Sequence, residues 1–386
     1  MDVKKKRVAI VGAGPSGLAA CKHALARGFR PVVFESGAAV SGVWARTLSS
    51  TRLQTPASTF RFSDFPWPVG TTAPEEFPRH DHVAAYMTAY ARRFRVLERV
   101  RFGSTVLAAE YVGPPEREVA AWERWSGNGE AFGDGTGEWR LTVRHAGSEG
   151  TQTYEFDFLV LCVGRYGVAK VPKFPQGRGP EVFHGQVLHS MDYSRMAHAE
   201  ADELIRGKRV VVVGSGKSGL DTVAHCAEAN ESSRDTTDYN RISARFLARL
   251  RMRSNHCPHG ILSLHRWLTA TLAEAYLKML IPFKKHGTAP ECSFSQSILG
   301  WRLGTLPEGF YDMVDEGSVR IKRCGSFRFC ADGLVLDGTG ERVGADVVIL
   351  ATGFDADRLL RRVFVSPRFR EIIGSGPSDT MLLLYR

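Results

Sequence analysis

Two glycine-rich segments of this chain have the residue types and spacing that hold phosphate groups. They are Gly12-Ala13-Gly14-Pro15-Ser16-Gly17 and Gly214-Ser215-Gly216-Lys217-Ser218-Gly219. In a G-x-G-x-x-G turn, the first glycine permits a tight turn and the second lets the backbone approach a pyrophosphate. The third lets the helix and the strand pack closely. The spacing therefore predicts two dinucleotide sites, each with the pyrophosphate at a helix N-terminus.

The residues after each turn differ. The first turn is followed by the strand-like run 31–34, which ends at Glu35, where a carboxylate would hold a ribose hydroxyl. After the second turn, residues 231–240 are polar and loop-like, so no second strand is expected there. The arginines between Arg241 and Arg253 are candidates to bind a 2′-phosphate, but a solvated basic helix explains them at least as well.

Two dinucleotide folds in one chain imply that two cofactors meet, as when a nicotinamide reduces a flavin. We expect FAD at the first turn and a nicotinamide cofactor at the second. Ser41-Gly42-Val43-Trp44 puts a flexible turn and a large flat ring where the flavin end of FAD would lie. Beyond the two turns, the residues expected to bind the cofactors are Glu35, Ser36, Gly42, Val43, Trp44, Val106, Ala351, Thr352 and Gly353.

A third segment carries a resemblance to a known family. Phe183, Gly185, His189 and Tyr193 form the pattern F-x-G-x-x-x-H-x-x-x-Y, which is similar to the identifying sequence of flavin-containing monooxygenases. Both glycine motifs and the strand end Ala-Thr-Gly-Phe stand in that family's order, and residues 63–68 resemble its plant branch. In Baeyer–Villiger relatives the motif ends in Trp followed by Pro or Asp, whereas Tyr193 is followed by Ser194.

The resemblance implies that NADPH reduces FAD and that reduced flavin and O2 form a C4a-hydroperoxide. A soft nitrogen or sulfur of a small-molecule amine or thioether then takes the distal oxygen. Because the cofactor performs the difficult chemistry, the protein positions it and excludes competing reactions. His189 is then expected as a hydrogen-bonded hinge residue rather than a proton donor. Gln54 is nearest to the place of the family's flavin-side asparagine, so we predict that it contacts the flavin or the hydroperoxide.

The order of the predicted elements indicates an α/β protein with two Rossmann-like dinucleotide-binding domains, the second inserted into the first. The expected boundaries are residues 1–168 for the FAD-binding domain, 169–345 for the NADP-binding domain and 346–386 for an incomplete return to the first. The family continues well beyond the Ala-Thr-Gly strand end, so a C-terminal truncation is expected. The alternative function is a catalytically impaired homologue that binds FAD weakly or acts through a partner. A Baeyer–Villiger monooxygenase and a disulfide reductase are more distant alternatives.

The composition argues against several other classes. The net charge of +10 is concentrated only in residues 4–7 and 241–253, and no nucleic-acid recognition module accompanies it. The seven cysteines form no Cys-x-x-Cys pair and no metal-ligand spacing, so neither a redox pair nor a metal site is expected. Residues 262–283 contain ionisable side chains, which favours an amphipathic helix over a membrane span. The expected location is the cytoplasm, or the periphery of the endoplasmic reticulum.

Overall fold

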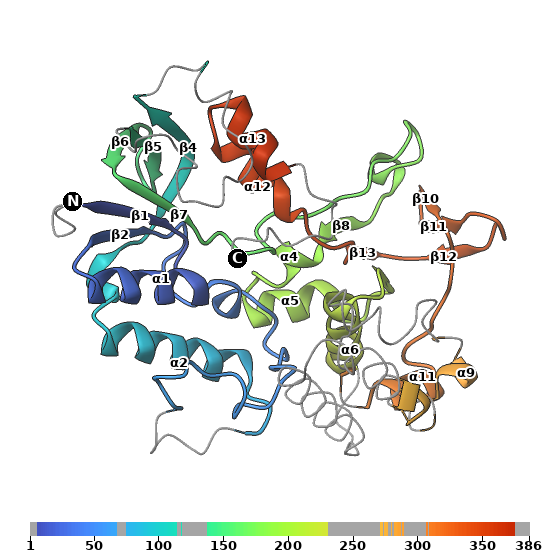
Figure 1. Ribbon diagram of the computed structural model, residues 1–386. Helices are drawn as coiled ribbons and strands as arrows, with labels where there is room; N and C mark the ends of the chain where they lie inside the picture. The colour runs from blue at the N-terminus through green and yellow to red at the C-terminus, as the bar shows by residue number, and fades with distance from the viewer. Residues whose placement is uncertain are drawn as a thin grey trace. The chain divides into compact units, whose positions relative to one another are not determined.

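The chain forms two compact units (Figure 1). The computed structural model describes residues 6–67, 75–113, 137–230 and 309–374, together with Arg117 and scattered positions between 271 and 307. Unit 1 comprises residues 1–46, 81–169 and 354–386, and unit 2 comprises residues 47–80 and 170–353. The chain therefore leaves unit 1, builds most of unit 2 and then returns.

Unit 1 contains a parallel sheet with the strand order β3-β2-β1-β7. Its strands are β1 (Arg7–Val11), β2 (Arg30–Phe34), β3 (Val100–Arg101) and β7 (Phe158–Leu161). β1 is buried along its length except at Arg7, as expected for a strand that is covered on both faces. Helix α1 (Pro15–Ala26) connects β1 to β2 and begins with a proline, which is favoured at the first helical position. The first βαβ unit is thus confirmed.

An antiparallel meander and the C-terminal helices complete unit 1. The meander consists of β4 (Ser104–Val112), β5 (Glu138–His145) and β6 (Thr151–Phe156), and the helices are α2 (His80–Arg93), α12 (Ala356–Val363) and α13 (Pro367–Gly374). Trp139 of β5 packs against Phe364 and Phe369, with ring centroids 5.8 and 5.2 Å away. These aromatic contacts hold the returning segment in the core of unit 1.

Unit 2 contains a second parallel sheet, in the order β8-β13-β9. Its strands are β8 (Gln186–His189), β9 (Val210–Val213) and β13 (Val347–Leu350), and its helices include α4 (Ser190–Tyr193), α5 (His198–Ile205) and α6 (Lys217–Asn230). The central strand β13 is fully buried. β13 is hydrogen-bonded between β8 and β9, and the last segment of unit 1 begins after it, at Phe354.

The other elements are short. Unit 2 also has an antiparallel sheet of β10 (Phe327–Cys330), β11 (Gly333–Leu336) and β12 (Arg342–Gly344), with helices α9 (Phe283–His286) and α11 (Phe310–Asp315). Short 3-10 helices are η2 (Gly42–Ala45), η3 (Leu97–Arg99) and η4 (Pro180–Val182). The basic stretch before β10 is largely exposed and forms no strand.

Among the described residues, no helix is long and apolar enough to cross a membrane. Most of the predicted amphipathic helix at 262–283 lies outside the described residues. The same is true of residues 231–253, where the arginines expected near a 2′-phosphate occur.

Candidate functional site

The first glycine turn is fixed by two backbone contacts in unit 1. Gly12 has a φ of +102°, and a Cβ atom there would lie 2.4 Å from the carbonyl oxygen of Cys162, just after β7. A Cβ atom at Gly17 would lie 1.9 Å from the carbonyl oxygen of Gly12. Neither position has room for a side chain, so packing of β1, α1 and the end of β7 requires both glycines.

The middle glycine of this turn, Gly14, has a different reason to be glycine. Gly14 is extended, with φ −76° and ψ −177°, and a Cβ atom there would meet Gly42 at an ordinary 3.7 Å. Gly14 precedes α1 and has no side chain to cap the backbone N–H groups in the first turn of that helix. Neither backbone strain nor packing among the described residues requires glycine here. A glycine at this place fits the close approach of a pyrophosphate to the helix N-terminus.

The second turn repeats this arrangement in unit 2. Gly214 has a φ of +131°, and its Cβ atom would lie 2.3 Å from the carbonyl oxygen of Ala351. A Cβ atom at Gly219 would lie 2.2 Å from the carbonyl oxygen of Gly214. A Cβ atom at Gly216 would meet no atom of the described residues within 4 Å. Ala351 thus supports the second turn as Cys162 supports the first, and both middle glycines leave space for a ligand.

Glu35 lies directly against the first turn. Its buried carboxylate accepts hydrogen bonds from the backbone N–H groups of Ala13 at 2.8 Å and Gly37 at 2.7 Å. The guanidinium of Arg46 lies 3.6 Å from the same carboxylate. The Ser36 hydroxyl also donates to Oε1, at 3.4 Å. These partners orient Glu35, and among the described residues Oε2, which accepts from Ala13, keeps an acceptor position for a ribose hydroxyl.

The segment with the predicted flavin-side ring is seated on the same turn. The N–H of Ser41 donates to the carbonyl of Ala13 at 3.0 Å, and its hydroxyl donates to the carbonyl of Ala84 at 3.1 Å. Ser41 has a φ of +95°, which is unusual for a residue other than glycine and marks a strongly constrained position. Val43 is 44% exposed and Trp44 is partly exposed, so η2 offers apolar surface to a ligand.

Two other residues expected at the cofactor differ in their exposure. Ser36 is exposed beside Glu35. Val106 is buried in the core of unit 1, so its side chain contributes packing there, and its role at a cofactor stays a prediction.

Three residues of the family-like motif, Phe183, His189 and Tyr193, are buried in unit 2, whereas Gly185 is exposed. Phe183 packs against Phe329 at a centroid distance of 5.9 Å, and a Cβ atom at Gly185 would lie 2.3 Å from the carbonyl oxygen of Asp346. His189 accepts a hydrogen bond from the N–H of Met191 at 3.1 Å and thereby caps α4. The motif therefore joins β8 and α4 to the central strand of unit 2.

Tyr193 ends the motif, and its hydroxyl lies 2.8 Å from Nδ1 of His225 on α6. The ring of Tyr193 is fully buried. No local pattern in the sequence indicates this partner, because helix α5 and strand β9 separate His225 from the motif. The bond connects α4 to the helix that begins at the second glycine turn.

Another interaction that sequence reasoning missed lies at the start of α6. Nζ of Lys217 forms an ion pair of 2.6 Å with Oδ1 of Asp221. Burial raises the pKa of Asp221, whereas the charge and hydrogen bond of Lys217 lower it. The four-residue spacing on a helix was the available signal. The pair fixes the lysine of the second turn against its own helix.

Gln54, the predicted flavin-side carboxamide, is exposed and belongs to unit 2. Its contact with the flavin stays a prediction. Thr352 and Gly353 follow Ala351 after β13, and the hydroxyl of Thr352 donates to the carbonyl of Lys170 at 2.6 Å. The Ala-Thr-Gly segment thus braces unit 2, and its contact with a cofactor also stays a prediction.

Comparison with known proteins gives the family. The family described as "Flavin-binding monooxygenase-like" matches residues 5–246. "Putative flavin-containing monooxygenase 2" of Arabidopsis thaliana is 34% identical over 94% of this chain and 74% of its own length. "Probable flavin-containing monooxygenase 1" of the same plant is 33% identical over 94% of this chain and 72% of its own length. The chain belongs to the flavin-binding monooxygenase-like family.

Solved structures show the same fold. "Oxidized steroid monooxygenase bound to NADP" has a TM-score of 0.59 and 22% identity, over 90% of this chain and 71% of that chain. "Crystal Structure of OTEMO complex with FAD and NADP (form 3)" has a TM-score of 0.64 and 18% identity, over 97% of this chain and 77% of that chain. The predicted α/β fold with two Rossmann-like domains, the second inserted into the first, is confirmed.

In the second turn, substitution by alanine is expected to have different effects at Gly216 and at Gly219. Gly216→Ala is expected to leave the thermal unfolding midpoint unchanged but to weaken binding of NADP+ by about tenfold, or about 1.4 kcal/mol. The reason is that the added methyl meets no described protein atom but would occupy the space expected for the pyrophosphate. Gly219→Ala is the control, because its methyl would collide with Gly214 and lower the midpoint. Calorimetric titration and thermal unfolding measure the two effects. Equal NADP+ affinity of Gly216→Ala and wild type would contradict the assignment.

His189 predicts a pH dependence of stability. Burial lowers its pKa, although Asp192 and a hydrogen bond with the Gly353 backbone raise it. As the pH falls below about 6.5, the His189 imidazole therefore takes up a proton more readily in the unfolded chain than in the folded chain. The resulting stability is fully present above about pH 6.5 and is lost as the pH falls, by at most about 1.4 kcal/mol per pH unit.

The variant His189→Asn tests this pH dependence. Asn retains a cap acceptor but does not titrate, so its free energy of unfolding should fall less between about pH 7.5 and about pH 5.5. Urea unfolding at each pH measures the difference. Parallel pH profiles for the variant and the wild type would rule out His189 as the titrating group.

Proposed function

We propose that this chain is an NADPH- and O2-dependent monooxygenase that oxygenates a soft nitrogen or sulfur of a small molecule, of the N,N-dimethylaniline monooxygenase type. The observation that carries the proposal is the pair of similarly built glycine turns, one in each unit, in a member of a flavin monooxygenase family. FAD would be held by the first turn with Glu35 and η2. NADPH would be held by the second turn at the start of α6.

Bound FAD would supply the redox chemistry that links NADPH to O2. In the overall reaction, substrate, O2, NADPH and a proton give oxygenated substrate, water and NADP+. The chain's own residues would bind the two cofactors and orient them. The first-turn amides of α1 and α6 would each bind a diphosphate, because the helix dipole favours negative charge there. Glu35, fixed by two backbone donors, orients a ribose. No proton-transfer residue is required of the protein in this scheme.

The end of the motif favours oxygenation of nitrogen or sulfur over a Baeyer–Villiger reaction. Tyr193 is fully buried, and its hydroxyl bonds to His225 at 2.8 Å. The Baeyer–Villiger pattern has a larger Trp at this position. An indole has no hydroxyl for His225 and adds volume to a closed core, so this core is built for tyrosine.

The described cysteines do not favour a disulfide reductase. Cys21, Cys162, Cys226, Cys324 and Cys330 are free thiols. Burial raises the pKa of Cys21 and Cys226 to about 12 and that of Cys162 to about 11. Such thiols remain protonated and unreactive at neutral pH.

The catalytically impaired homologue remains the alternative function that an experiment must distinguish from an active monooxygenase. The cytoplasmic location and the association with the endoplasmic reticulum also remain predictions.

The oxygenation assay tests the proposal directly. The purified chain is expected to be yellow, to be bleached by NADPH without oxygen and to regain its colour in air. With a panel of amines and thioethers and isotopically heavy O2, mass spectrometry should detect products that carry one heavy oxygen atom. NADH in place of NADPH is the control for cofactor preference. NADPH consumption without any oxygenated product would instead support the impaired homologue, and a colourless protein would exclude the enzyme.

Substitution of Gln54 is expected to change the coupling of the reaction, defined as the oxygenated product formed per NADPH oxidised. Gln54→Ala should lower coupling by about fivefold, the factor for about 1 kcal/mol of a lost hydrogen bond. Gln54→Asn keeps the carboxamide and should retain most of the coupling. Ser50→Ala, at a nearby exposed position, is the matched control. Unchanged coupling in Gln54→Ala would refute a contact with the flavin.

A further inference from the structure

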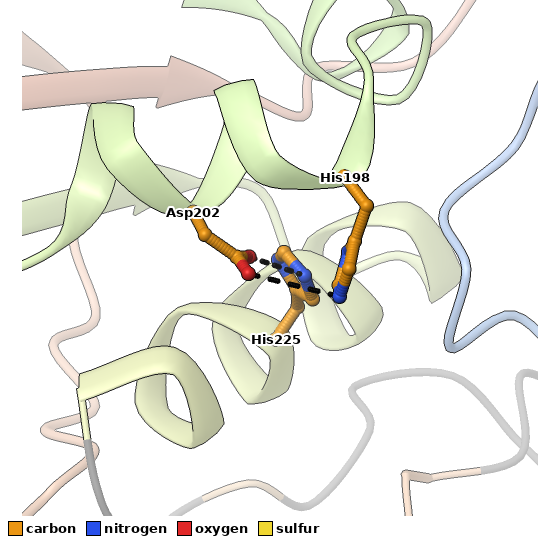
Figure 2. A group of neighbouring side chains, drawn as sticks. All are labelled: His198, Asp202 and His225. Atoms are coloured by element: carbon orange, nitrogen blue, oxygen red, sulfur yellow. Dashed lines mark ion pairs between the residues drawn. The ribbon is translucent and has the colours of Figure 1, made fainter.

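Three side chains outside the predicted cofactor residues converge between two helices of unit 2 (Figure 2). His198 and Asp202 lie four residues apart on α5, and Figure 2 shows both pointing toward His225 on α6. Nε2 of His225 lies 3.4 Å from Oδ1 of Asp202, and Nε2 of His198 lies 3.6 Å from Oδ2 of Asp202. One ligand atom from each residue lies within 4.8 Å of the other two.

The second nitrogen of each imidazole has a hydroxyl partner. Nδ1 of His225 lies 2.8 Å from the hydroxyl of Tyr193, and Nδ1 of His198 lies 3.2 Å from the hydroxyl of Ser49. When each Nδ1–H donates to its hydroxyl, both Nε2 lone pairs face the carboxylate of Asp202. Metal-bound histidines are oriented in this way, by a hydrogen bond from the nitrogen that does not bind the metal.

Unlike the imidazoles, the carboxylate of Asp202 has one oxygen without a hydrogen-bond donor among the described residues. Within the described part of the chain, its Oδ1 is buried and makes no hydrogen bond. The 3.4 Å separation from His225 exceeds the usual N–H···O range of about 2.7–3.2 Å. A buried charged oxygen without a hydrogen bond is costly, and a cation beside it would remove this cost.

The spacing also fits one metal ion. Four ligands at about 2.0–2.1 Å from a tetrahedral Zn²⁺ stand about 3.3 Å from one another. The separations of 3.4 and 3.6 Å, which run to the two different oxygens of Asp202, are close to this value, and one ligand atom from each residue can be chosen so that all three lie within 4.8 Å.

We propose that His198, Asp202 and His225 form a binding site for a divalent transition-metal ion, with Zn²⁺ the best match. Imidazole and carboxylate are ligands that Zn²⁺ accepts, and a three-residue site leaves a fourth position for water. The side chain of His198 is 63% exposed, so the site is open to solvent on that side. Because α6 begins at the second glycine turn and Tyr193 ends the family-like motif, the ion would fasten α5 to both.

The cysteine pattern gave no reason to expect a metal. The histidine and aspartate on α5 have a spacing of four residues, which places them on one face of a helix. The third ligand comes from the next helix, and only the fold brings it near.

Zinc binding by the full chain tests the proposal. After treatment with EDTA, the protein is titrated with Zn²⁺ in a calorimeter, and its metal content is measured after dialysis. His198→Ala and Asp202→Asn should each bind one equivalent less than wild type. His184→Ala, which removes an exposed histidine of the same unit, is the matched control and should bind as wild type does. His198→Cys supplies another zinc ligand and should restore the equivalent.

Two further measurements separate a metal site from a plain ion-pair network. Co²⁺ should give the visible absorption of a tetrahedral site in wild type but not in Asp202→Asn. Saturating Zn²⁺ should raise the unfolding midpoint of wild type and His184→Ala but not of Asp202→Asn. Asp202→Asn is nearly isosteric, and circular dichroism verifies that it folds. Equal zinc stoichiometry in wild type and Asp202→Asn would overturn the proposal, whatever the oxygenation assay shows.

Discussion

Two contacts between a glycine and the carbonyl at the end of a neighbouring strand determine the rest of this structure. Gly12 lies against the carbonyl of Cys162, and Gly214 lies against that of Ala351. A side chain at either glycine would push the strand before the turn away from its neighbour. The third glycine of each turn then packs on the first, which brings the helix start over the strand ends. In parallel α/β sheets this edge is where ligands bind.

The same constraint gives the family-like motif its physical meaning. Strand β13 is approached by a glycine at each end, because Gly185 lies against the carbonyl of Asp346 and Gly214 lies against that of Ala351. A side chain on either glycine would displace β8 or β9 from the central strand. His189 adds a third connection, since it is paired with Leu350 at the end of β13. The motif and the Ala-Thr-Gly strand end are therefore two parts of one packing arrangement in unit 2.

The sequence predicted the local features and missed those that join distant segments. The spacing of the first glycine turn and the strand-like run 31–34 sufficed for α1 and β2, because helix initiation and strand formation depend on neighbouring residues. The bond between Tyr193 and His225 had no such signal. Nor did the assignment of residues 47–80 to unit 2, where Leu48 packs in one core cluster with Tyr193. Such contacts depend on how separate elements pack, which local patterns do not encode.

The polar chain from Tyr193 through His225 to Asp202 lies in a part of unit 2 where apolar side chains would be expected to stabilise the fold more. Removing such groups from water is costly, and replacing a buried ion pair by apolar residues is often neutral or stabilising. Tyr193 and His225 satisfy each other, but Oδ1 of Asp202 is left without a hydrogen bond among the described residues. A purely structural network would be expected to complete its hydrogen bonds. The incomplete bonding of Asp202, with two imidazoles turned toward it, is therefore better explained by a bound cation than by packing alone.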